Sequence, residues 1–369
     1  MLVKNILDIL EDWAPQKIAL SKDNIGLQLG NPNNSVFKIL IALDVTKDVI
    51  EEAIKKNIDL LIVHHPLIFE PLKNISSNDK IGSLIYTIIE NKISLIAIHT
   101  NLDFTNNGVS FALANKIGLN KIKILKRSKN LLRKIVVFIP LEYTEKILES
   151  MALEGAGLIG NYEFCSYRST GIGTFKGSSE SNPFIGKQGE FENVEEIRLE
   201  MIVPEWKIEN VIKAMKKSHP YEEPAFDIYP TENESNSFGA GAYGIYEEAL
   251  TPKKFLSQIK EQLGVDILKY TDGVKDKIKT VAVCGGSGID LLPSAIAVNA
   301  DAFITADINY HSYNHAEGKI MLIDAGHFET EIPILDVITT YLKNKFAQLK
   351  ENIQVIQTTQ SKNIIKTFY

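Results

Sequence analysis

Apolar residues follow two different periods in the first third of the chain. Short apolar runs predict strands at residues 37–43, 59–63 and 93–98. Amphipathic spacing predicts the helices that alternate with them, at residues 1–13, 47–57 and 80–90. Strands that alternate with helices indicate a largely parallel sheet, so this part of the sequence predicts an α/β fold.

The last third of the chain repeats this alternation. Apolar runs predict strands at residues 280–284, 302–305 and 319–323. Helical spacing is found at residues 252–263 and 290–298, and in a long segment that begins near Glu331. A second α/β lobe is therefore expected.

Between the two lobes, residues 130–232 show a different order of elements. Strand, helix, strand, strand, helix and strand follow one another, which is the order of the split βαβ unit in ferredoxin-like domains. The polar run TENESNS at residues 231–237 reads as a linker. We therefore predict an N-terminal α/β lobe at 1–129, a ferredoxin-like insert at 130–237 and a C-terminal α/β lobe at 238–369.

The two outer lobes show a weak internal resemblance. Residues 38–66 and 279–307 both run from strand through turn and helix to a second strand with polar residues at its end. SLIAIHTNLD and IMLIDAGHFETE both end a strand in a loop that carries histidine and carboxylate. A pseudo-twofold pair of lobes would bring both sets of loops into one crevice.

Composition narrows the class of protein. Of 369 residues, 44% are hydrophobic and 23% charged, which is ordinary for an ordered globular chain, and the net charge of −6 is spread without a basic stripe for nucleic acid. The N-terminus is amphipathic, unlike a signal peptide, and no segment has the roughly 20 apolar residues of a membrane span. The two cysteines, Cys165 and Cys284, form no C-x-x-C pair. We expect a cytoplasmic protein.

Side chains that bind metals follow three predicted strands. In open α/β sheets, ligands lie outside the carboxyl ends of the strands. Strand LLIV is followed by His64 and His65, and strand SLIAI is followed by His99 and then Asp103. Strand MLI is followed by Asp324, His327 and then Glu331.

The spacing of His327 and Glu331 places both on one face of a helix's opening turns, so that they can reach one ion. With His64, His65 and Asp103 they make five ligands, too many for one closed tetrahedral site. Two ions about 3.5 to 4 Å apart, joined by a bridging carboxylate, would employ all five ligands. Imidazole and carboxylate ligands suit zinc, iron, manganese or cobalt, so they do not identify the metal. A single histidine at a strand end is usually structural, so the prediction rests on the set.

Three further residues are candidates for contact with a substrate or for proton transfer: His99, Asp307 and His311. Capping roles explain them equally well. CGGSG at 284–288 could cradle an anion but is better explained as a tight turn. Cys284 lacks a partner that would activate it as a nucleophile. The Gly239-x-Gly241-x-x-Gly244 pattern lacks the preceding strand of a dinucleotide fingerprint, so we interpret it as a turn joining the lobes.

Five motifs occur at separate places along nearly the whole chain, in the order DNIGLQLG, HHPLIF, HTNLD, SHPYEEPAFDIYP and DAGHFETE. Together they resemble the Nif-three-like family, known as GTP cyclohydrolase I type 2 homologues. The resemblance is to the longer members of that family. It implies an insert similar to the CutA and P-II folds and a ring-like homohexamer.

The resemblance also implies a dinuclear centre. His65 and Asp103 would hold one ion, His64 and His327 the other, and Glu331 would bridge them. Two departures from the family pattern lie away from these ligands. Residues 239–244 lack the family's arginine, and Thr305, Ala306 and Asp307 stand where the family has Thr-Gly-Asp.

Two functions fit these observations. The first is a metal-dependent hydrolase, in which water activated by the metal pair attacks a small nucleotide-like substrate; the resemblance suggests GTP, although the chain has no P-loop motif. The second is a non-catalytic ring that binds metal or senses a metabolite through the insert. Metal-dependent turnover would distinguish them.

Overall fold

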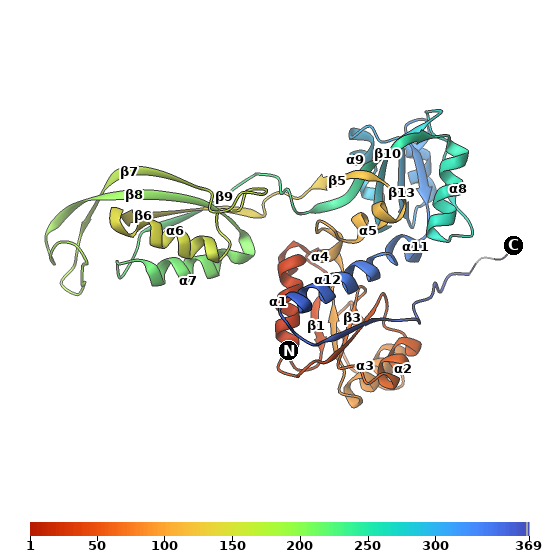
Figure 1. Ribbon diagram of the computed structural model, residues 1–369, viewed down its shortest axis with the longest axis horizontal. Helices are drawn as coiled ribbons and strands as arrows, with labels where there is room; N and C mark the ends of the chain where they lie inside the picture. The colour runs from red at the N-terminus through yellow and green to blue at the C-terminus, as the bar shows by residue number, and fades with distance from the viewer. Residues whose placement is uncertain (367, 369) are drawn as a thin grey trace. The chain divides into compact units, whose positions relative to one another are not determined.

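The fold is mixed α/β, with several sheets. The computed structural model describes residues 1–366 and 368, and the chain forms two compact units (Figure 1). The first unit combines Met1–Arg127 with the chain from Ser237 onward, and the second is Ser128–Asn236. Among the described helices, none is long and apolar enough to cross a membrane.

One sheet of the first unit has the strand order β1-β4-β3-β2-β15. Its strands are β1 (Gly26–Leu29), β2 (Lys38–Ala42), β3 (Leu60–Val63), β4 (Ser94–Ala97) and β15 (Gln354–Gln357). All are parallel except β1, which pairs antiparallel with β4 at the edge. The parallel pairing of β2, β3 and β4 confirms the prediction for the first third of the chain.

Helices cover both faces of this sheet, which explains why LLIV in β3 is apolar at every position. Alternate strand residues such as Ile39 and Ile62 pack against α1 (Val3–Trp13) and α12 (Ile334–Gln348). The intervening residues, such as Leu61, pack against α2 (Lys47–Lys55) and α3 (Lys80–Glu90). Side chains of Thr46 and Asp79 cap α2 and α3 by accepting hydrogen bonds from Val49 N (3.2 Å) and Gly82 N (2.7 Å).

The other sheet of the first unit has the order β11-β14-β13-β12-β10-β5. Its strands are β5 (Asn120–Arg127), β10 (Gly239–Leu250), β11 (Lys269–Tyr270), β12 (Ile278–Ser287), β13 (Ala302–Ala306) and β14 (Met321–Asp324). Strands β12, β13 and β14 are parallel, and the others pair antiparallel. One face packs on α5 (Val109–Lys116) and α8 (Pro252–Leu263), the other on α9 (Leu292–Ala297) and α10 (Tyr310–Ala316).

Each of these sheets receives one strand from the opposite end of the chain. β15, near the C-terminus, pairs with β2, whereas β5 from the first third pairs with β10. The sequence pattern did not predict this exchange, because β5 and β15 lie outside the alternation of strands and helices. The exchange ties both ends of the chain into the same unit.

Two local predictions, for residues 239–244 and 161–167, were wrong. Residues 239–244 are not a turn but the start of β10, a strand between β12 and β5. The long helix expected from about Glu331 is confirmed as α12, which begins at Ile334 because Pro333 separates it from the short helix α11 (His327–Glu331). The strand expected near residues 161–167 is β7 (Ser166–Lys176), which is longer and lies further along the chain.

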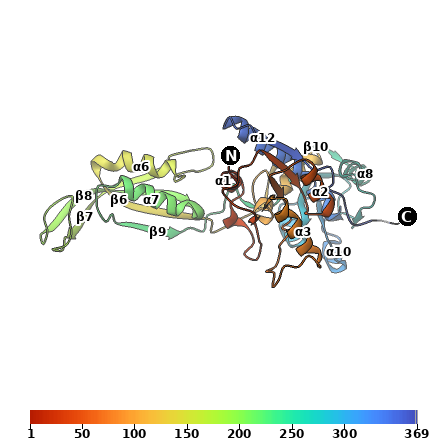
Figure 2. The same ribbon diagram turned by 90° about the horizontal axis from the view of Figure 1, so that it is seen from below.

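The second unit is built from one antiparallel sheet and two helices (Figure 2). Its elements in chain order are β6 (Leu132–Pro140), α6 (Thr144–Leu153), β7, β8 (Phe191–Pro204), α7 (Ile208–Ser218) and β9 (Phe226–Pro230). The sheet order is β7-β8-β6-β9. Both helices pack on the sheet, through residues such as Ile147 and Met215 against Val137 and Leu199.

A buried carboxylate fastens the C-terminal segment to α2. Glu52 accepts hydrogen bonds from Thr358 Oγ1, Thr359 N (3.2 Å) and Lys56 Nζ (2.6 Å), and it is only 9% exposed. Replacing Glu52 with alanine leaves the hydroxyl of the buried Thr358 without this acceptor. We expect Glu52→Ala to lower the free energy of unfolding by about 1–3 kcal/mol, measured by denaturant titration.

The matched control is Glu51→Ala. The neighbouring Glu51 is exposed and makes an ion pair with Lys47 at 3.7 Å, so its loss should cost less than about 0.5 kcal/mol. Equal effects of the two substitutions would show that the buried contacts of Glu52 do not hold the C-terminal segment.

Candidate metal centre

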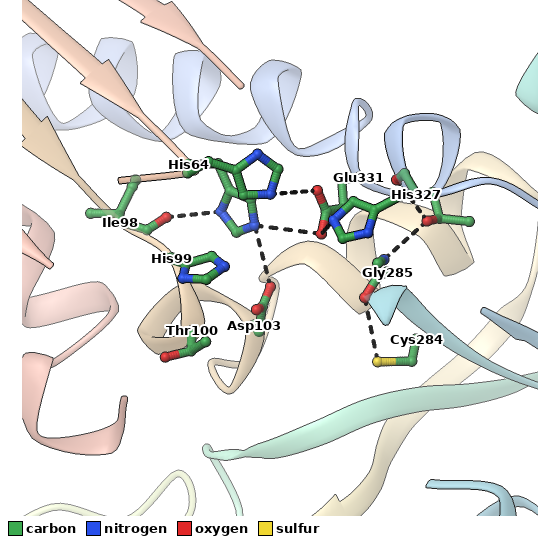
Figure 3. Close-up of polar contacts among 12 residues, drawn as sticks. His64, Ile98, His99, Thr100, Asp103, Cys284, Gly285, His327 and Glu331 are labelled. Atoms are coloured by element: carbon green, nitrogen blue, oxygen red, sulfur yellow. Dashed lines mark hydrogen bonds and ion pairs between the residues drawn. The ribbon is translucent and has the colours of Figure 1, made fainter. Parts of the chain in front are cut away.

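The candidate ligands lie where the carboxyl ends of strands from both sheets of the first unit meet (Figure 3). His64 and His65 directly follow β3, and their backbone amides continue its pairing by donating to Ala42 O and Leu43 O. His99 follows β4, and Asp103 ends the short helix α4 (Thr100–Asp103). His327 and Glu331 begin and end α11, which follows β14.

Glu331 lies among three imidazole rings. Its Oε1 atom is 3.0 Å from His327 Nε2 and 3.8 Å from His64 Nε2. Its Oε2 atom is 3.0 Å from His65 Nε2. The side chain is 4% exposed, so both oxygens are held inside the site. The two oxygens thus face different imidazoles.

Asp103 also faces His64, with Oδ1 3.6 Å from His64 Nε2. Two groups of side chains can each hold a metal ion: His64 with His65 and His99, and His65 with His327 and Glu331. His99, which the sequence alone set apart from the ligands, is thus part of the cluster (Figure 3).

Each of the four histidines is oriented by an oxygen at Nδ1. His64 Nδ1 is 2.8 Å from Ile98 O, and His65 Nδ1 is 2.8 Å from Asp44 Oδ1. The other two pairs are His99 Nδ1 with Asp23 Oδ1 at 2.9 Å, and His327 Nδ1 with Asp307 Oδ2 at 2.6 Å. Carbonyl and carboxylate oxygens only accept, so each Nδ1 donates and each Nε2 presents a lone pair when the ring is neutral.

Two of these buried acceptor atoms face each other without a donor between them. His64 Nε2 and Asp103 Oδ1 lie 3.6 Å apart, and neither has a hydrogen-bond partner among the described residues. Buried polar atoms without partners are rare in native proteins, and each needs an explanation. A cation between acceptors satisfies all of them at once, so this set of residues fits divalent metal ions.

The charges of the cluster shift the pKa values of its members. Burial alone would lower the pKa of His65, but the carboxylates of Asp44 and Glu331 raise it to about 10. Contact with Glu331 raises the pKa of His327 to about 9. Burial lowers the pKa of His64 to about 4. Burial also raises the pKa of Asp103 well above its usual range, reinforced by the charge of Glu331.

Two acidic residues of the site were missed by sequence reasoning. Burial would raise the pKa of Asp23, but hydrogen bonds from His99 and Thr100 lower it to about 2, so it is ionised at neutral pH. Asp23 is the first residue of DNIGLQLG, and no strand precedes it to mark it. Asp44 could have been found, because it follows strand β2 by the same strand-end logic that found His64.

The other predicted residues occupy different places. Asp307 contacts His327 and orients its ring. His311 is exposed on α10, and its described ring contact is with Tyr310. Burial raises the pKa of Cys284 to about 12, which opposes a role as nucleophile.

The segment CGGSG is part of the wall of the site. Gly286, in β12, donates its amide to Thr330 Oγ1 at 3.0 Å and has a φ of +61°. A Cβ atom there would overlap Glu331 Oε1 and lie 3.2 Å from His327 Nε2. Because glycine has no Cβ atom, the carboxylate of Glu331 can lie directly against this strand.

Comparison with known proteins places the chain among relatives of nearly its own length. The family described as Duf34/NIF3 (NGG1p interacting factor 3) matches residues 1–364. A protein named GTP cyclohydrolase 1 type 2 homolog from Halalkalibacterium halodurans is 39% identical over 326 residues, 88% of each chain. One of the same name from Bacillus subtilis is 38% identical over 331 residues, 89% of each chain.

A solved structure has the same fold. The crystal structure of a Bacillus cereus protein related to NIF3 superposes with a TM-score of 0.87 at 34% sequence identity. The similarity covers 100% of this chain and 99% of that one. It therefore includes both compact units.

We expect Gly286→Ala to weaken metal binding about 10- to 100-fold, because the methyl group must displace Glu331. The control is Gly264→Ala. Gly264 has a similar φ of +67°, but a Cβ there meets none of the described atoms within 4 Å. Both variants carry the same backbone cost of about 1–2 kcal/mol. Equal metal affinities of the two variants in a metal titration would contradict the close approach of Gly286 to Glu331.

Metal binding should release protons. With pKa values of about 10 and 9, His65 and His327 are protonated at neutral pH unless a metal replaces the proton. Apparent affinity should therefore rise with pH until these two pKa values are passed, and calorimetric enthalpies should vary with the ionisation enthalpy of the buffer. An affinity that does not change as pH rises from neutral to the pKa of His327 would contradict this protonation.

The same shifts give the metal-free protein a pH-dependent stability. Raised pKa values at His65 and His327 contribute stability that is complete below pH 6.5 and is lost as pH rises through 9 and 10. The lowered pKa of His64 acts on the acid side, where stability is lost as pH falls from 6.5 towards 4. Denaturant titrations across this range should therefore show a maximum near neutral pH, and a flat profile would contradict the shifts.

Proposed function

The chain belongs to the Duf34/NIF3 family, and on that premise we propose that it is a metal-dependent hydrolase with a dinuclear centre. The proposed ligands are His64, His65, Asp103, His327 and Glu331. His65 and Asp103 would hold one ion and His64 and His327 the other, and Glu331 would contribute to both. The metal is zinc, iron or manganese, since imidazole and carboxylate suit each of these.

One observation carries the proposal. Glu331 turns its two oxygens towards different imidazoles, and the buried His64 Nε2 and Asp103 Oδ1 have no hydrogen-bond donor among the described residues. A carboxylate with one oxygen for each ion is the bridge that two-metal sites use.

When bound, such a metal pair lowers the pKa of water and polarises the bond under attack. The chain's own contribution to proton transfer is His99. Its Nδ1 is held by the ionised Asp23, so Nε2 faces the cluster and can accept or return a proton. Asp44 and Asp307 keep His65 and His327 in the orientation that ligation needs.

The substrate we propose is nucleotide-like, as the names of the relatives suggest. Phe69 supports this choice. It is 55% exposed, and its ring meets His99 edge-on at 6.2 Å between centroids. An exposed aromatic ring beside the cluster offers a purine a surface for stacking.

We also propose that residues 128–236 form a ferredoxin-like insert related to CutA and P-II, that the chain assembles as a homohexamer and that it works in the cytoplasm. The order of elements, β6-α6-β7-β8-α7-β9, and the sheet order β7-β8-β6-β9 support the fold of the insert. The assembly rests on the resemblance alone, and light scattering that gives a monomer would count against it.

The proposal is tested first by metal content per chain, after reconstitution with zinc, iron and manganese in turn. Wild type should bind two equivalents, and His65→Ala and Glu331→Gln should bind fewer because each removes a ligand of an ion. His311→Gln is the control, since this exposed histidine is outside the cluster. No metal in wild type, or no loss in the two ligand variants, would remove the basis of the proposal.

Turnover is tested second, with GTP and a panel of nucleotides and phosphoesters. Product should depend on metal and disappear in Glu331→Gln. Because His99 also belongs to one of the two groups that could hold an ion, metal content decides its role: as a proton carrier, His99→Gln should keep both ions and lose about 100-fold or more in kcat, whereas loss of an ion would make it a ligand. Metal binding without turnover on the whole panel would instead favour a non-catalytic metal-binding protein.

A further inference from the structure

The second compact unit contains a cavity of about 400 Å³. This volume lies in the range of sites for small molecules, roughly 300–1,000 Å³. All of its lining residues lie within Phe138–Ala225, so the cavity belongs to this unit alone. Its wall combines aromatic rings with carboxylates, among them Phe175, Phe184, Tyr221, Glu196, Glu222 and Glu223.

The aromatic rings form a connected group. Phe184 stands perpendicular to Tyr143, with 5.6 Å between ring centroids, and its centroid is 6.3 Å from that of Tyr221. Phe184 is 48% exposed, so the group is open to a ligand from solvent. Aromatic faces carry partial negative charge and attract cations within about 6 Å.

Glu196 is held in place beside the rings. Its Oε1 atom accepts a hydrogen bond from the Tyr221 hydroxyl at 2.9 Å. Its Oε2 atom lies against the backbone of Gly173, where a Cβ atom would overlap it. A strand residue without a side chain is what allows this carboxylate to lie over the sheet.

The three carboxylates of the wall have no cationic partner among the described residues. The cavity is lined by no lysine, arginine or histidine among the described residues. The ion pairs described within residues 128–236 go to Glu145, Glu200, Glu205 and Glu234 and not to the three carboxylates of the wall. Glu222 accepts a hydrogen bond from the backbone amide of Asn182 at 2.9 Å.

We propose that this cavity is a second ligand site of the protein, which binds a small organic amine in its protonated form. The ammonium group lies between the carboxylates and the ring faces, and the apolar part of the amine fills the space lined by Phe175 and Phe184. This site goes beyond the proposed hydrolase function and uses no residue of the metal centre.

The chemistry of the wall selects this class of ligand. An anion would be repelled by the three carboxylates. A hydrated metal ion gains little from a wall that is largely aromatic, because Mg²⁺ and Ca²⁺ need about six or more oxygen ligands. A neutral apolar ligand would bury carboxylates without a partner, which is costly. An organic ammonium ion satisfies both the rings and the carboxylates.

The test is isothermal titration calorimetry of the full metal-loaded chain with 2-phenylethylamine, compared with the uncharged 2-phenylethanol of nearly the same shape. The amine should bind at least about tenfold more tightly, because only it carries the charge. Glu196→Gln should weaken amine binding about tenfold or more, since it removes a charge that faces the ligand. Gly173→Ala should do the same by displacing the Glu196 carboxylate.

The matched control is Glu195→Gln. Glu195 is exposed and, because successive side chains of a strand point to opposite faces, it leaves β8 away from Glu196. Its substitution should not change amine binding. Thermal denaturation checks that each variant is folded, and Glu222→Gln replaces Glu196→Gln if the latter is not.

Equal binding of amine and alcohol would overturn the proposal, and so would amine binding that is indifferent to both Glu196→Gln and Glu222→Gln. Guanosine that binds more tightly than the amine and depends on Glu196 would also overturn it in favour of a nucleobase site. Metal content is measured in each variant and should stay at the wild-type value. Failure of the amine site is thus distinguishable from failure of the metal centre.

Discussion

The structure of the first unit depends on how the buried charge of Glu331 is balanced. A carboxylate that is 4% exposed loses its hydration, and the loss is tolerated only if nearby groups replace it. Here imidazoles replace the lost water: His64 and His65 follow β3, and His327 begins α11. The Nδ1 atoms of His65 and His327 are held in turn by carboxylate oxygens. Parallel strands bring these rings together, because β3 ends in one sheet and β14 in the other. Neither sheet alone contains the cluster.

The main elements of the fold and the core of the site could be predicted from sequence, because both depend on local patterns. LLIV followed by His64 and His65 is a buried strand with polar rings at its end, and the structure has that strand at Leu60–Val63. The spacing of His327 and Glu331 predicted a shared helix face, and their side chains do meet at 3.0 Å. Such features can be predicted because a few residues that are close in sequence determine them.

Other features could not be predicted, because they depend on contacts between distant segments. The pairing of Asp23 with His99 joins residues 76 positions apart, and no local pattern marks an aspartate before β1 as a partner. The glycines of β10 read as a turn because glycine disfavours strands, yet tertiary packing between β12 and β5 determines that they form one. Gly286 likewise reads as a turn residue until Glu331 is seen beside it.

The balance of charge around the cluster also bears on how it binds metal. Asp103 and Glu331 lie within it, and three further carboxylates hold its histidines from outside: Asp23, Asp44 and Asp307. One divalent ion together with protons on His65 and His327 would supply four positive charges, the same number as two divalent ions with neutral imidazoles. Histidine binds metal only in its neutral state, so each ion that enters the cluster must displace protons from the rings that hold it. The outer carboxylates therefore do more than orient rings, because their negative charge also favours divalent cations over protons in the cluster.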